Sequence, residues 1–127
     1  MVRESPGQYG TNAKSYDLEE RTFRFAREVR EFVRHLPRTI ANIEDVRQLI
    51  RASGSVGANY IEANEALGKK DFLMRIKICR KEAKESRYFL RLLNTEGKEA
   101  LEAERNRLLQ EAAELMNIFG AIYRKSN

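Results

Sequence analysis

Few residues in this sequence have the type and spacing that catalysis requires. The only histidine, His35, lies two residues before Pro37, where the partial negative charge of a helix C-terminus favours a cationic side chain over a general base. The only cysteine, Cys79, occupies an apolar position of a helical pattern and has no neighbouring histidine to generate a thiolate. We therefore interpret His35 as a helix-terminal residue and Cys79 as a small core residue.

Two further patterns resemble binding motifs but lack essential residues. Glu62 and Glu65 are three residues apart, whereas a di-iron helical bundle pairs a glutamate with a histidine at this spacing. The sequence Gly68-Lys69-Lys70 has no Ser or Thr after the lysine and no first glycine of a phosphate-binding loop. We therefore predict no catalytic residues, no metal site, no cofactor and no small-molecule substrate, and we expect a protein that is not an enzyme.

The positive charge of the chain is concentrated in one segment. The 127 residues include 24 Lys and Arg against 19 Asp and Glu, but segment 69–93 alone has nine basic and three acidic residues. Eight residues share one side of the predicted helix there, which we call the basic face: Lys70, Lys77, Arg80, Lys81, Lys84, Arg87, Tyr88 and Arg91. Such a face is typical of proteins that neutralise the phosphates of a nucleic acid, and Tyr88 would be a stacking platform for a base. The alternative is a solvated, lysine-rich helix surface.

Four amphipathic segments must position these residues. Helix-favouring Ala, Leu, Glu, Arg and Lys dominate the sequence, and apolar residues recur at steps of three and four in four stretches, approximately 17–36, 42–67, 71–93 and 98–124. Heptad-like stripes joined by short connections predict an all-α fold, an up-down-up-down antiparallel four-helix bundle.

The predicted bundle domain covers residues 16–127. Residues 1–15 collect Gly, Pro, Ser and Asn without an apolar period, which predicts a flexible N-terminal arm. The sequence has neither a signal-like apolar start nor a run of about 18 apolar residues, so we expect a cytoplasmic protein without a membrane partner.

The second predicted helix contains Gly54 and Gly57, although each glycine costs a helix about 1 kcal/mol relative to alanine. Asn42 is the expected N-cap of this helix. Its stripe keeps a three-four period through the glycines, over Ile43, Val46, Ile50, Ser53, Gly57, Tyr60 and Asn64. We therefore expect one uninterrupted helix whose small residues let a neighbouring helix approach closely.

The third predicted helix has two apolar sides. Its core stripe is Phe72, Ile76, Cys79, Ala83, Ser86, Leu90 and Leu93, and beside it lies a second apolar face of Met74, Ile78, Phe89 and Leu92, interrupted by Glu85. This arc is wider than a helix of a monomeric bundle needs, which indicates a subunit interface, although contacts with two neighbouring helices are the alternative.

A polar column on the second helix accompanies the close-packed segment. Six polar residues share one side of this helix: Glu44, Gln48, Arg51, Ser55, Asn59 and Glu62. The last four of them flank the close-packed segment, and we call these four the polar column. We expect them to hydrogen-bond to a neighbouring helix or subunit, the alternative being an ordinary solvated face.

The sequence also resembles a known family. The column belongs to a motif formed by Arg51, Ser55, Val56, Asn59, Tyr60 and Glu62, which is followed by Asp71 and Phe72. This motif is similar to that of the bacterial four helix bundle protein family, also called 23S rRNA intervening sequence proteins, and the resemblance covers about residues 16–124. Family members commonly read Asn-Ile-Ala-Glu-Gly where this chain reads Asn-Tyr-Ile-Glu-Ala, so we expect the turn after the second helix near Leu67 and Gly68.

The resemblance implies an up-down bundle that assembles into a ring-shaped homo-oligomer, a homopentamer with a central channel. Some relatives are encoded within 23S rRNA genes, and a more distant one binds nucleic acid and reverse transcriptase through a basic surface. We therefore expect a non-enzymatic homo-oligomeric bundle that contacts RNA or DNA phosphates through the basic face, whether that face lines a channel or the outer surface. The alternative is a protein-interaction scaffold that binds no nucleic acid.

Overall fold

Four helices and no strand make up the part of the chain that the structure describes. The computed structural model describes the backbone of residues 12–127 and the side chains of residues 18–127. The helices are α1 (Asn12–Val33), α2 (Ile40–Asn64), α3 (Lys69–Leu92) and α4 (Glu99–Ser126). Helix α1 begins inside the predicted arm, whose first eleven residues lie outside the described range. The turn over residues 65–68 includes Leu67 and Gly68, as expected.

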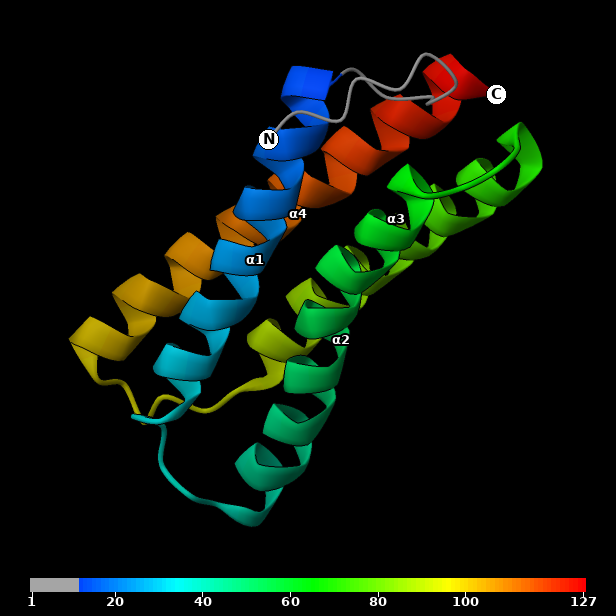
Figure 1. Cartoon of the computed structure of the whole chain (residues 1–127). Helices are drawn as coiled ribbons and strands as arrows, with labels where there is room; N and C mark the ends of the chain where they lie inside the picture. The colour runs from blue at the N-terminus through cyan, green and yellow to red at the C-terminus, as the bar shows by residue number, and fades with distance from the viewer. Residues whose placement is uncertain (1–11) are drawn as a thin grey trace.

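Each helix packs against the next one in the sequence, and α1 also packs against α4. The largest contacts join α2 to α3 and α3 to α4, and the smallest joins α1 to α4. In Figure 1 the connections 34–39 and 93–98 lie at the lower end of the molecule. The start of α1, the turn over 65–68 and the end of α4 lie at the upper end. The result is a four-helix bundle.

The apolar stripes of α3 and α4 lie in the core where the sequence places them. All seven predicted core residues of α3 are buried. In α4 the same period predicts a stripe of Leu101, Arg105, Leu108, Ala112, Leu115, Phe119 and Ile122, of which Arg105 and Ile122 are half-buried and the other five are buried. Arg105 occupies one position of the α4 stripe. Its guanidinium donates hydrogen bonds to the carbonyl oxygens of Leu90 and Leu93 at the end of α3. A charged residue at a core position thus satisfies carbonyl groups that a helix end leaves unpaired.

The predicted core stripe of α2 is wrong in its first half. Ile43 is 38% exposed and Val46 only half-buried, whereas the buried residues of α2 are Asn42, Leu49, Ala52, Ser53, Val56, Tyr60, Ala63 and Asn64. Helix α2 packs against both α1 and α3, so it buries two adjoining sides. Many of these positions hold small or polar residues, which carry little hydrophobic signal in the sequence.

Helix α2 runs without interruption through Gly54 and Gly57, as predicted. A methyl group at Gly57 would lie 2.9 Å from Oγ1 and 3.2 Å from Cβ of Thr22, a buried residue of α1. The absence of a side chain at Gly57 therefore allows α1 and α2 to approach closely, which confirms the reason predicted for this glycine.

Asn42 is not the N-cap of α2. Thr39 caps the helix, and its side-chain oxygen accepts a hydrogen bond from the backbone N–H of Asn42 at 3.0 Å. The buried Asn42 amide instead joins two connections: it donates to the carbonyl oxygens of Pro37 and Asn94 and accepts from the Asn94 N–H, each at 2.9 Å. Sequence position alone does not distinguish a cap from such a link, because Thr and Asn both suit an N-cap.

Replacing Asn42 with alanine should destabilise the bundle. The substitution removes three part-buried hydrogen bonds, to the Pro37 and Asn94 carbonyl oxygens and from the Asn94 N–H, and each contributes about 0.5–1.5 kcal/mol. Urea unfolding should show this loss, while Asn106→Ala on the exposed side of α4 should change the free energy of unfolding by less than about 0.5 kcal/mol. Equal stability of the two variants would contradict a structural role for the Asn42 side chain.

Candidate nucleic-acid interface

The basic face lies on the surface of α3, on the side away from its core stripe. Burial of that stripe against α2 and α4 determines which residues of α3 face solvent, and all eight residues of the basic face are exposed. Within residues 18–127, six of its seven cations make no ion pair or side-chain hydrogen bond: Lys70, Lys77, Arg80, Lys84, Arg87 and Arg91. These charges have no internal counter-charge there and can meet an anionic partner.

Three members of the basic face have contacts within their own chain. The Lys81 ammonium lies 3.9 Å from carboxylate oxygens of both Glu82 and Glu85, so part of its charge is already compensated. The Lys77 ammonium lies 5.8 Å from the centre of the Tyr123 ring, a cation–π contact with α4. Tyr88 is 54% exposed, and its ring meets the ring of Phe89 edge to face with centres 5.2 Å apart.

The second apolar face of α3 is exposed at its ends and partly covered in its middle. Met74 and Leu92 are 48% and 47% exposed on the single chain. Ile78 and Phe89 are half-buried, and Phe89 packs against the core cluster. The apolar surface available to a partner is therefore largest near the two ends of α3.

The polar column of α2 makes hydrogen bonds to α3, one of the two alternatives expected from the sequence. Arg51 contacts Glu85 at 2.8 Å and Glu82 at 3.3 Å, and Arg75 donates to the Asn59 side chain at 2.9 Å. Asn59 in turn donates to the Ser55 side chain and carbonyl. Glu82 is only 5% exposed, and the Arg51 guanidinium is the nearer of the two cations, with Lys81, that compensate its buried carboxylate. The Glu62 side chain is exposed and makes no hydrogen bond or ion pair in the described part of the chain.

The structure supports the interpretation of Cys79 as a core residue. Cys79 is fully buried, its thiol donates to the Val56 carbonyl oxygen at 3.4 Å, and burial raises its pKa to about 12. A thiol with this pKa does not supply a thiolate near neutral pH. His35 is exposed and contacts the Glu31 carboxylate at 3.3 Å. No cluster of three or more His, Cys, Asp or Glu side chains with metal-binding geometry occurs among the described residues.

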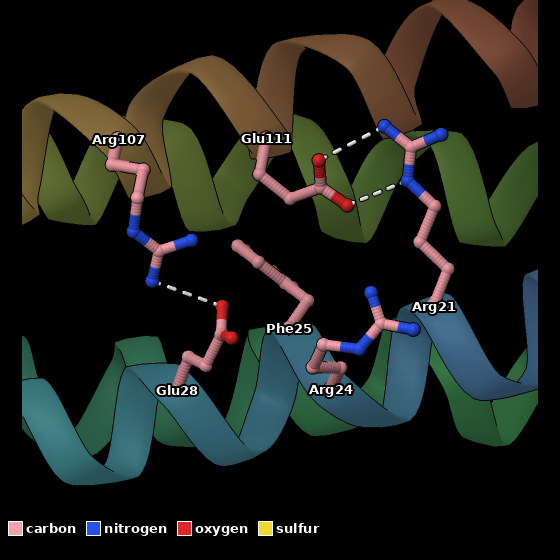
Figure 2. A pocket seen from close by; sticks show the side chains of 6 residues that line it. All are labelled: Arg21, Arg24, Phe25, Glu28, Arg107 and Glu111. Carbon is pink, nitrogen blue, oxygen red and sulfur yellow. Dashed lines mark hydrogen bonds and ion pairs between the residues drawn. The ribbon is translucent and has the colours of Figure 1, made fainter.

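A polar pocket of about 360 Å³ lies between α1 and α4 (Figure 2), and the sequence analysis did not anticipate it. Its lining is Arg21, Arg24, Phe25, Glu28, Arg107 and Glu111. Arg21 pairs with Glu111 at 2.7 Å and Arg107 pairs with Glu28 at 3.0 Å, so ion pairs join the two helices across the pocket. These ion pairs link α1 to α4, the two neighbouring helices that pack least against each other. The charges of 17–36 and of 98–127 each sum to zero, which conceals this pairing in the sequence.

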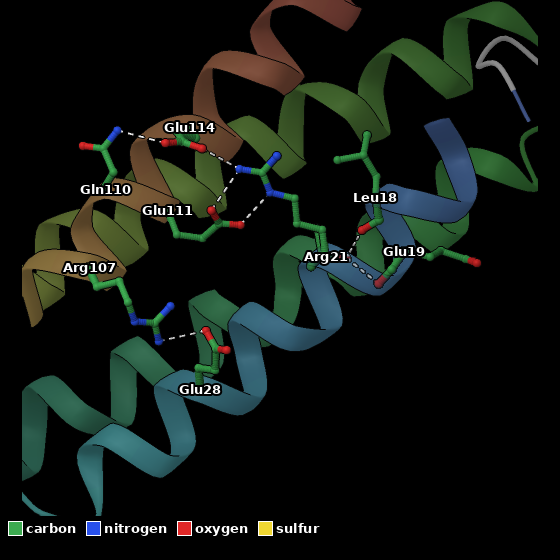
Figure 3. Close-up of polar contacts among 9 residues, drawn as sticks. Leu18, Glu19, Arg21, Glu28, Arg107, Gln110, Glu111 and Glu114 are labelled. Carbon is green, nitrogen blue, oxygen red and sulfur yellow. Dashed lines mark hydrogen bonds and ion pairs between the residues drawn. The ribbon is translucent and has the colours of Figure 1, made fainter. Parts of the chain in front are cut away.

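Glu114 extends this set of ion pairs and makes it sensitive to acid (Figure 3). Gln110 donates a hydrogen bond to Glu114, and Arg21 lies 2.7 Å from it; these contacts lower the pKa of Glu114 below its ordinary value of 4.5. Stabilisation by Glu114 is therefore present above pH 4.5 and is lost as the pH falls through the lowered pKa.

Glu114→Gln should therefore melt at a lower temperature than the unmodified chain at pH 7. The difference should shrink as the pH falls below 4.5 and disappear below the lowered pKa, because both chains then carry an uncharged side chain at position 114. Calorimetry at several pH values measures this difference. A gap in melting temperature that does not shrink as the pH is lowered below 4.5 would contradict the ion-pair explanation.

Comparisons with known proteins agree with this architecture. Residues 14–121 match the profile of a family described as 23S rRNA-intervening sequence protein. Among solved structures, the chain resembles a protein of unknown function from the S23 ribosomal protein family of Bacteroides thetaiotaomicron, with a TM-score of 0.69 and 22% identity over 83% of this chain and 96% of that chain. At this identity the likeness establishes the fold alone. No curated protein matches the sequence. Within the described residues, no helix is both long and apolar enough to cross a membrane.

Proposed function

Because this chain belongs to the 23S rRNA-intervening sequence protein family, we propose that it is a non-enzymatic cytoplasmic protein that binds RNA or DNA phosphates through the basic face of α3. The observation that carries the proposal is the exposure of all eight residues of this face, six of whose seven cations lack an internal counter-charge in the described part of the chain. Cations held on a rigid helix release counterions from a phosphate backbone, which drives binding without regard to sequence.

We further propose that the antiparallel bundle, with up-down-up-down topology, assembles into a ring-shaped homo-oligomer, a homopentamer. The exposure of Met74 and Leu92 supports this proposal, because a second copy would cover apolar surface that a monomer leaves in water. The interface would also include Ile78, Phe89 and Glu85 of α3 and the polar column of α2. A ring brings several basic faces onto one particle, which strengthens the field that an anionic partner meets.

Fluorescence anisotropy with a labelled single-stranded RNA tests the proposed function. Binding should be measurable at about 50 mM salt, and the logarithm of the association constant should fall with a slope of roughly −3 to −5 against the logarithm of salt concentration, as expected for four to seven phosphate contacts. An absence of binding to RNA and DNA at low salt would overturn the proposal and favour a protein-interaction scaffold. The native mass in solution tests the oligomer separately, and a monomer would contradict the ring.

A further inference from the structure

Two arginines from different helices meet over a single glycine of α4. Gly120 lies inside α4, where glycine costs about 1 kcal/mol relative to alanine, and it is buried. A methyl group at this position would lie 3.3 Å from Nε of Arg80 and 3.4 Å from Nη1 of Arg124. The two guanidinium groups therefore lie over the same point of the α4 backbone. The distance between Arg80 Nε and Arg124 Nη1 cannot exceed the sum of their distances from the methyl position at Gly120.

This pair of guanidinium groups has no counter-charge within residues 18–127. Neither arginine forms an ion pair or a side-chain hydrogen bond there, and α4 has no acidic residue after Glu114. A third cation, Lys77, lies one turn before Arg80 on α3, and its ammonium lies over the ring of Tyr123, the residue before Arg124.

Other arginines of the chain are arranged differently. Several of them contact carboxylates: Arg21, Arg34, Arg47, Arg51, Arg105 and Arg107. Two like charges in such proximity repel each other unless an anion lies between them. The planar fork of a guanidinium matches the oxygen atoms of a phosphate group, so two forks on one glycine make a suitable cradle for one phosphate.

We propose that Arg80 and Arg124, assisted by Lys77, form a discrete binding site for one phosphate group of the nucleic acid that lies along the basic face. This inference rests on the proposed function and deepens it. It extends the interface from α3 onto α4. It also assigns one position where the placement of two guanidinium groups, and not only the overall positive charge, binds a phosphate. The missing side chain of Gly120 gives both guanidinium groups room to lie against the helix backbone.

Charge-preserving and charge-removing variants of Arg124 test the site. Arg124→Gln should weaken the binding of a labelled single-stranded RNA about tenfold, the usual effect of losing a hydrogen-bonded charged contact. Arg124→Lys should lose nearly as much, because lysine keeps the charge but lacks the fork. Arg91→Gln removes one charge from the same basic face and should cost only about two- to threefold. Wild-type affinity in Arg124→Lys, or equal losses in Arg124→Gln and Arg91→Gln, would overturn the proposal.

A second measurement separates this inference from the proposed function. Pyrophosphate is titrated into the full chain while the Nε–Hε signals of its arginines are followed by NMR. Selective shifts of the Arg80 and Arg124 signals, absent in Arg124→Gln, would support the site even if no RNA bound, in which case only the proposed function fails. Uniform shifts of all exposed arginines would overturn the site while leaving RNA binding by the basic face intact.

Discussion

Gly57→Leu should destabilise the bundle by about 1–3 kcal/mol, although leucine is the better helix former. Even a methyl group at this position would approach Thr22 Oγ1 to 2.9 Å, and Thr22 is buried with its hydroxyl hydrogen-bonded to the Leu18 carbonyl oxygen. The larger side chain therefore has no space unless α1 moves away from α2, which would expose part of the core. The midpoint of thermal unfolding should fall by at least about 4 °C.

Gly54→Ala is the matched control for this prediction. Its methyl group would meet only the end of the Arg30 side chain, at 3.1 Å from Nη2, and this exposed group can shift by a few tenths of an ångström while weakening only its solvent-exposed hydrogen bond to the Ile50 carbonyl oxygen. The variant should therefore equal or exceed the stability of the unmodified chain, by up to about 1 kcal/mol from helix propensity. A wild-type melting temperature in Gly57→Leu would contradict the close approach of α1 and α2.

Reversing three charges of the basic face should remove nucleic-acid binding at about 50 mM salt. Lys84, Arg87 and Arg91 are suitable because none of them pairs with another residue in the range 18–127, so their replacement by Glu breaks no internal contact there. Lys81 is unsuitable, since a glutamate there would lie beside Glu82 and Glu85. Anisotropy measures binding, and circular dichroism confirms that the variant remains folded.

A second triple variant controls for total charge. Arg27, Arg38 and Lys98 are exposed, lie outside α3 and likewise have no ion pair among the residues that the structure describes, and Arg27 contacts only the exposed ring of Phe23 there. Their replacement by Glu changes the net charge equally. This control variant should retain RNA binding with only modest weakening from the long-range field. Equal loss in both variants would mean that total charge, and not the basic face, determines affinity.

The core of α3 and the identity of its basic face could be predicted from the sequence, because both follow from one regular period. Residues from Phe72 to Leu93 alternate at steps of three and four, and a helix that buries such a stripe must expose the opposite side. The continuity of α2 through Gly57 was predictable for the same reason. The subunit interface and nucleic-acid binding remain predictions.

Other features depended on contacts between segments far apart in the sequence. The core residues of α2 differ from those predicted because two neighbours bury small side chains there, and Asn42 links two connections because Asn94 lies beside it. The ion pairs between α1 and α4 and the meeting of Arg80 with Arg124 also arise only when the helices pack. Periodicity along one helix thus determined which sides are apolar or basic. Only the tertiary structure decided which charges pair and which are left without a counter-charge, because Coulomb interactions depend on distance in space and not on separation along the chain.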